Sequence, residues 1–103
     1  MATLTLTVPS TFYLDDMESE VLASVGDRLR DDYGYERSGA VSRDSSANRD
    51  SYPLSPAGAI VVEKKADRLI VKLHGVEADS HDLFRAVSSD LEQRHEGVSA
   101  EID

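Results

Sequence analysis

The sequence has no cysteine among its 103 residues. This absence excludes disulfides, thiolate metal sites, iron–sulfur clusters and cysteine nucleophiles, so the fold has to rest on packing alone. A run of about 18 apolar residues is also missing, and Met1–Ser10 lacks the basic start and apolar stretch of a signal peptide. We therefore expect a soluble, cytoplasmic protein that forms a single domain over residues 1–103.

Basic residues are scarce: 11 Lys and Arg stand against 20 Asp and Glu, which gives a net charge of −9. This acidity argues against direct contact with nucleic acid or with an anionic membrane, because both kinds of contact need clusters of Lys and Arg. The charge is unevenly spread. Residues 1–32 carry −5 and residues 57–103 carry −4, whereas residues 33–56 are neutral.

The N-terminal third of the chain has a strand pattern followed by a helix pattern. Leucine or valine alternates with threonine in Thr3–Val8, which is typical of a strand with one buried face. Over residues 15–33, apolar side chains recur every four positions and predict an amphipathic helix. Asp15, with Glu18 three positions later, predicts a capping pair at its start. Gly26 inside this helix should cost about 1 kcal/mol relative to alanine, unless another backbone passes close by.

Residues 59–74 contain two alternating segments that predict a β-hairpin with its turn at Ala66–Asp67. In this register Lys64 faces Leu69 across the hairpin, on the same side as Ile60. That side carries most of the apolar residues, so we expect it to face the core.

The last quarter of the chain predicts a second helix and a short final strand. Asp79 or Ser80 is a candidate cap for a helix that Gly97 ends. Residues 98–102 alternate between apolar and polar types, which predicts a last strand.

The predicted order is βαββαβ, and this order favours an α+β fold of the ferredoxin-like type. Right-handed connections would place two helices on one face of a small antiparallel sheet in a two-layer sandwich, with the other face open. The open face would carry Val61 and Ile70 among threonines, which allows a homodimer formed through this face.

Residues 34–58 predict a long flexible loop between the first helix and the second strand, because apolar residues there are sparse and unphased. Such a segment is either a tolerated insertion or a partner-binding element that orders on contact. Residues 33–56 hold tyrosines and arginines, the types that often carry interface energy. These candidate partner-binding residues are Tyr33, Tyr35, Arg37, Arg43, Arg49 and Tyr52.

The sequence lacks the motifs of most catalytic chemistries. It has no Gly-x-Ser-x-Gly sequence, no glycine-rich phosphate loop after the first strand, and no aromatic platform for RNA on the predicted sheet. One cluster contains ligand types for a metal: His74, Glu77, Asp79, His81 and Asp82. Because the aspartates already suit a helix N-terminus, we regard His74, Asp79 and His81 as weak metal candidates only. We expect no enzyme activity, no catalytic residue and no cofactor.

These observations predict a small acidic interaction protein, of the inhibitor, adaptor or immunity type, that binds a basic protein partner. Contact would be made through the acidic helices and the 33–56 segment. The candidate acidic residues are Asp15, Asp16, Glu18 and Glu20. Three alternatives stay open: a nucleic-acid mimic that blocks a DNA- or RNA-binding protein, a small-molecule sensor dimer, and a metal-dependent enzyme that uses the residues 74–82.

Overall fold

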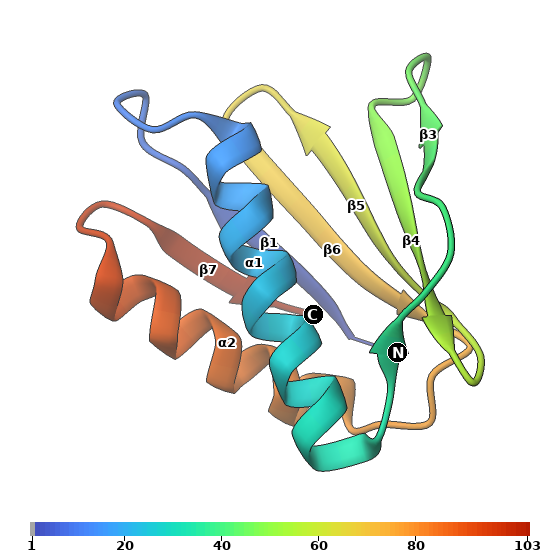
Figure 1. Cartoon of the computed structure of the whole chain (residues 1–103). Coiled ribbons are helices and arrows are strands. Elements are labelled where there is room, and N and C mark those ends of the chain that lie inside the picture. Colours follow the sequence, from blue (N-terminus) through green and yellow to red (C-terminus); the bar gives the residue numbers. More distant parts are fainter. Residues whose placement is uncertain (1) are drawn as a thin grey trace.

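Two α-helices pack against one face of a seven-stranded antiparallel sheet in the computed structural model, which describes residues 2–103 (Figure 1). The chain is therefore a mixed α+β protein, as expected, and its radius of gyration is 12.7 Å. The elements, in chain order, are β1 (Thr3–Thr7), α1 (Leu14–Arg28), the π-helix η1 (Leu29–Tyr33), β2 (Glu36–Arg37), β3 (Ser42–Asp44), β4 (Arg49–Ser55), β5 (Ala59–Lys65), β6 (Arg68–His74), α2 (Ser80–Arg94) and β7 (Ser99–Ile102).

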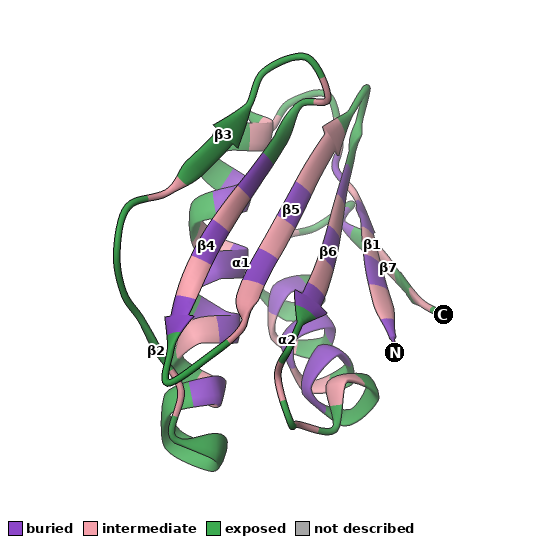
Figure 2. Ribbon diagram, turned by 90° about the vertical axis from the view of Figure 1, so that its right-hand side faces the viewer, coloured by how far each residue is buried: buried purple, intermediate pink, exposed green. Residues whose placement is uncertain are grey.

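The strands follow the order β2-β4-β5-β6-β1-β7, and β3 pairs with the same strand β4 as β2 does. Both helices lie on one side of the sheet, and the other side is uncovered (Figures 1 and 2). The helix α2 lies against β1 and β7 at one end of the sheet. The strands β2, β3 and β4 form the opposite end, on the far side of α1 from α2. The helix layer thus covers the middle and one end of the sheet.

The core lies between the helices and the sheet, and its side chains come from alternate strand positions (Figure 2). Leu4 and Leu6 of β1 are fully buried, while the threonines that alternate with them along the strand are half-buried on the uncovered face. Phe84 of α2 is also fully buried. Burial of each large apolar side chain contributes about 1.5–3 kcal/mol, so this layer is the main source of stability.

The predicted hairpin is confirmed in position and register. Lys64 pairs with Leu69 and Ile60 pairs with Leu73, and the turn falls at residues 66–67. Ala66 takes a positive φ of 50°, which the tight connection requires although alanine rarely adopts it. The final strand is also confirmed: β7 pairs with β1, with Ala100 opposite Leu6.

The ferredoxin-like βαββαβ order is wrong for the chain as a whole, because residues 34–58 are not a long loop. They contain β2, β3 and β4, and β4 pairs with β5 from Arg49 to Pro53. Asp50, Tyr52 and Leu54 alternate toward the core with less buried neighbours, as a strand requires. The alternation was hidden because one core-facing position is an aspartate and Pro53 interrupts the pattern.

The N-terminal end of α2 agrees with the sequence-based prediction, whereas the N-terminal end of α1 does not. Asp79 is the N-cap of α2, and its Oδ1 accepts a hydrogen bond of 3.1 Å from the backbone N–H of Asp82. The predicted capping pair of Asp15 and Glu18 is wrong, because α1 begins at Leu14 and its N-cap, Tyr13, makes no side-chain capping bond. Within residues 2–103, no helix is long and apolar enough to cross a membrane.

Candidate functional site

A groove of about 480 Å³ runs between the N-terminal half of α1 and the strands β3, β4 and β5. We call it the α1–β4 groove. It brings together charged side chains from segments that lie far apart in the sequence. It is lined by Asp15, Glu18, Ser19, Leu22, Arg37, Val41, Arg43, Tyr52 and Lys64.

Lys64 of β5 is the centre of the charges in this groove. Its Nζ lies 3.0 Å from Oδ1 of Asp15, 3.3 Å from Oε1 of Glu18 and 3.6 Å from Oδ2 of Asp50. The hydrogen bond to Asp15 raises the pKa of the Lys64 ammonium, burial opposes this, and the Glu18 carboxylate adds to it. Lys64 therefore stays charged and holds three carboxyl groups from α1 and β4 together.

Glu18 is a buried carboxyl group on the inner side of α1, with only 6% of its surface exposed. Burial raises the pKa of Glu18; Lys64 opposes the shift, and the neighbouring Asp50 adds to it. Oε1 faces the Lys64 ammonium, whereas Oε2 is buried without a hydrogen-bond partner. Glu18 therefore holds its proton to a higher pH than an ordinary glutamate, and one of its oxygens is available to a further group.

One carboxylate oxygen of Asp50, Oδ2, lies near an ammonium, a guanidinium and a hydroxyl group. Besides Lys64, its Oδ2 accepts a hydrogen bond of 3.3 Å from Nη1 of Arg43 and a long one of 3.4 Å from the Tyr52 hydroxyl. Burial, together with the charges of Glu18 and Asp50, raises the pKa of Tyr52 to about 12. Arg37 lies over the Tyr52 ring, with its guanidinium carbon 4.8 Å from the ring centroid.

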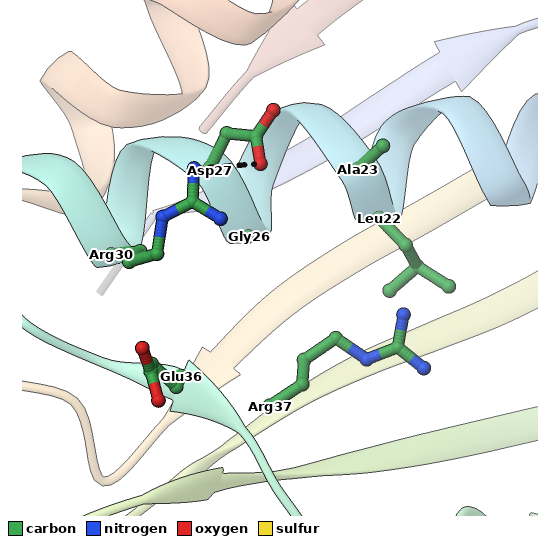
Figure 3. A pocket seen from close by; sticks show the side chains of 7 residues that line it. All are labelled: Leu22, Ala23, Gly26, Asp27, Arg30, Glu36 and Arg37. Atoms are coloured by element: carbon green, nitrogen blue, oxygen red, sulfur yellow. Dashed lines mark ion pairs between the residues drawn. The ribbon is translucent and has the colours of Figure 1, made fainter.

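A second pocket, of about 340 Å³, continues along α1 toward its C-terminal end (Figure 3). Leu22 and Arg37 line both this pocket and the α1–β4 groove, so the two adjoin. Arg37 extends from β2 beneath Leu22, while Arg30 reaches back to Asp27, with a nitrogen–oxygen distance of 3.4 Å (Figure 3). Gly26 leaves the helix surface open at this point.

A third pocket, of about 300 Å³, lies between α1 with η1 and the neighbouring helix α2. We call it the interhelical acidic cleft, because four of its lining residues are aspartates and two are arginines. Arg28 and Asp90 bridge it with an ion pair of 3.0 Å. Its lining consists of Ala23, Ser24, Asp27, Arg28, Asp31, Asp32, Asp90 and Arg94.

The predicted partner-binding residues of the 33–56 segment are only partly brought together. Arg37, Arg43 and Tyr52 meet in the α1–β4 groove, and Tyr52 is buried rather than available on the surface. Tyr35 lies elsewhere, where its hydroxyl accepts a hydrogen bond of 3.0 Å from the backbone N–H of Glu77.

Arg49 faces the uncovered side of the sheet, where its Nε lies 3.3 Å from Oε1 of Glu63. Tyr33 is 37% exposed at the end of η1.

The predicted acidic residues of the first helix also separate into two groups. Asp15 and Glu18 belong to the α1–β4 groove. Asp16 is exposed, and Oε2 of Glu20 lies 2.7 Å from Nε2 of His95, next to α2. These four residues therefore do not form one contact surface.

The weak metal candidates are not brought together either. His74 is exposed at the end of β6, Asp79 caps α2, and Nδ1 of His81 lies 3.2 Å from Nη2 of Arg85. Over residues 2–103 no group of three or more His, Asp or Glu is placed so that it could hold a metal ion.

Lys64 and Asp50 were missed as site residues, although one of them had a signal in the sequence. The predicted hairpin register already placed Lys64 on the core-facing side, where a lone ammonium group needs a partner. Asp50 had no such signal, because its strand was expected to be a loop.

Comparison of the chain with models of protein families, with curated proteins and with solved structures found no match. The function is therefore argued from the geometry and charge of the molecule.

Proposed function

We propose that the protein is a non-enzymatic binding module, of the inhibitor, adaptor or immunity type, that docks a basic protein partner on its helix layer. The observation that carries this proposal is the interhelical acidic cleft, where Asp27, Asp31, Asp32 and Asp90 line one concave surface. Arg28 and Arg94 line the same cleft, and Arg30 pairs with Asp27 and Asp31 from its edge. The four aspartates still exceed these three arginines by one charge, so the cleft suits a lysine or arginine side chain of a partner.

The distribution of charge over the two faces supports this choice of surface. Residues 14–33, which form α1 and η1, carry seven acidic and two basic side chains. On the uncovered sheet face, the strands β4, β5, β6, β1 and β7 present four basic and two acidic side chains. The acidity of the protein is thus concentrated on the helix side, so a basic partner would be steered toward that side.

The π-helical turn η1 gives the cleft its shape. π-Helices are rare and are often found at functional sites, since the wider turn changes the direction of the side chains it carries. Here η1 carries Asp31 and Asp32 into the cleft and ends at Tyr33, whose ring is partly exposed beside them. An exposed tyrosine at the rim of an acidic surface is a common anchor at protein interfaces.

The role expected for the 33–56 segment changes. Arg43 and Arg49 already form ion pairs with Asp50 and Glu63, so we do not assign these two guanidinium groups to partner docking. The proposal therefore keeps Tyr33 as a contact residue and assigns Tyr52 to the core. It replaces the predicted acidic residues Asp15, Asp16, Glu18 and Glu20 by the cleft aspartates Asp27, Asp31, Asp32 and Asp90.

The test is a pull-down from the lysate of the source organism at low and high salt. It compares the intact protein with a cleft variant, Asp27→Lys/Asp31→Lys/Asp32→Lys. The matched control is Asp67→Lys/Glu96→Lys/Glu101→Lys, which changes the net charge equally at exposed positions outside the cleft. We expect a stoichiometric partner to be retained at low salt by the intact protein and the control, and to be lost from the cleft variant. Equal loss from both variants would show that only net charge matters, and equal retention by both would show that the partner does not dock in the cleft; either result would refute the proposal.

A further inference from the structure

The α1–β4 groove contains polar groups whose hydrogen-bonding capacity the fold does not use in full. They are of two complementary kinds, an acceptor and a set of donors. One is a buried carboxyl oxygen, Oε2 of Glu18, which has no hydrogen-bond partner. The other is the set of free N–H donors on the guanidinium groups of Arg37 and Arg43, which line the strand side of the same groove. We propose that this groove is a binding site for a small hydroxy- or amino-carboxylate, whose carboxylate contacts the arginines and whose hydroxyl or amino group reaches Glu18.

The glutamate side of the site is argued from burial. An unmet polar atom in the interior costs about 1–3 kcal/mol unless a further group satisfies it. Glu18 lines the groove and is more than nine-tenths buried, so a group that bonds to Oε2 has to enter from the groove. A hydroxyl group can donate to this oxygen or accept from it when Glu18 carries a proton, and an amino group can donate to it.

The arginine side is argued from unused donors. Arg43 makes a single hydrogen bond of 3.3 Å to Asp50, and 65% of its side chain is exposed, so most of its five N–H groups remain free. Arg37 is fixed in position by the Tyr52 ring and forms no ion pair with a carboxylate in residues 2–103. Two guanidinium groups with free donors on one side of a groove suit a planar carboxylate.

The size and charge of the groove select the class of ligand. The groove volume of about 480 Å³ is in the usual range for small-molecule sites, and the side chains of Leu22 and Val41 form the apolar part of its wall. A metal cation is disfavoured, because the Lys64 ammonium and the Arg43 guanidinium already occupy positions beside the carboxyl groups and would repel it. A phosphate dianion is disfavoured as well, since it would lie beside Asp15 and Glu18.

The experiment follows backbone amide resonances of the intact protein by two-dimensional NMR during titration with four probes. L-serine and L-lactate carry both groups, acetate carries only the carboxylate, and ethanolamine carries only the hydroxyl and amine. We expect saturable shifts at Glu18, Arg43 and Tyr52 with L-serine or L-lactate, with a Kd on the order of 1 mM for so small a probe. Acetate and ethanolamine should bind at least about tenfold more weakly.

Two variants and a control assign the contacts. Arg43→Gln changes an exposed side chain, and we expect it to weaken binding of both L-serine and acetate by about tenfold. Glu18→Gln should abolish the preference for L-serine over acetate. Arg85→Gln, on α2 and outside both the groove and the interhelical acidic cleft, should bind like the intact protein.

Three results would overturn the proposal: no saturable shift up to about 50 mM of any probe, shifts scattered over basic residues of the whole surface, or unchanged binding in Arg43→Gln. The last result decides the question even if Glu18→Gln does not fold. Because the groove and the interhelical acidic cleft share no residue, failure here leaves the proposed partner docking untouched.

Discussion

Oε1 of Glu18 on α1 lies 3.3 Å from Nζ of Lys64 on β5, and this contact ties the first helix to the sheet through buried charge. The two residues are 46 positions apart in the sequence, and both lie on the core-facing side of their elements. The same ammonium group reaches Asp15 and Asp50. A single ammonium group thus contacts three carboxyl groups, of which Glu18 and Asp50 are buried where little water can replace it.

Replacing Lys64 should therefore destabilise the protein more than any other change of a basic residue. Lys64→Met keeps the aliphatic stem but leaves Glu18 and Asp50 buried without their common partner, which we expect to cost about 3 kcal/mol. Urea denaturation measures this difference. The control is Lys65→Met, since Lys65 is exposed and lies 3.9 Å from Glu63; it should change the free energy of unfolding by less than about 0.5 kcal/mol. Equal effects of the two variants would contradict this account.

The raised pKa of Glu18 predicts how stability depends on pH. Because the folded-state pKa lies above the ordinary glutamate pKa of 4.5, the folded state binds the Glu18 proton more tightly than the unfolded state does. This contribution is fully present below the unfolded-state pKa and is lost as the pH rises through the folded-state pKa.

Glu18→Gln removes this titration, so the free-energy deficit of the variant should shrink as the pH rises from about 4 to about 8. Urea denaturation of both proteins at several pH values measures it. Asp16→Asn, a change at an exposed position two residues before Glu18, should show no such trend. A constant or growing deficit of Glu18→Gln would show that the assigned direction is wrong.

The strands and helices with clear periodicity could be predicted from the sequence. The hairpin of β5 and β6 was correct to the residue, since apolar side chains at every second position fix the register of a strand with one buried face. The strand β4 was missed. Its core-facing Asp50 is stabilised by Arg43, by the nearby Tyr52 hydroxyl and by Lys64, and the contact with Lys64 exists only once β4 and β5 are paired.

The candidate sites were less predictable for the same reason. The α1–β4 groove needs charges from α1, β4 and β5 to converge, and only the fold brings them together. The sequence did indicate tyrosines and arginines of the 33–56 segment as special, but as surface contacts. The structure instead buries Tyr52 and pairs Arg49 with Glu63. Residue type alone does not tell whether an arginine binds a partner or its own chain.

The two helix N-termini should respond differently to loss of an aspartate. Asp79→Ala removes the capping bond to the N–H of Asp82 and should cost about 1 kcal/mol. Asp16→Ala, in the first turn of α1, removes no capping bond and should cost less than about 0.5 kcal/mol through the helix dipole alone. Thermal unfolding of the two variants beside the intact protein measures the difference. A larger loss for Asp16→Ala than for Asp79→Ala would contradict this difference between the two helix N-termini.

Substitution by alanine should have opposite effects on the free energy of unfolding at Gly26 and at Gly58. Gly26 lies inside α1, and a Cβ atom built there meets nothing within 4 Å, so no close backbone explains the glycine. Gly26→Ala should therefore raise the free energy of unfolding by about 0.5–1 kcal/mol, because glycine loses more backbone entropy in a helix.

Gly58, between β4 and β5, has a φ of 89°, and a Cβ there would lie 2.6 Å from the carbonyl oxygen of His74. Gly58→Ala should destabilise the protein by more than Gly26→Ala stabilises it, since it combines backbone strain with a contact that only movement of β6 can relieve. Urea denaturation of both variants tests the pair. Because Gly26 also lines the pocket of Figure 3, a stable Gly26→Ala variant that loses partner binding would mean that the glycine is kept for access to that pocket. A destabilised Gly26→Ala would instead contradict the open surroundings of this helix position.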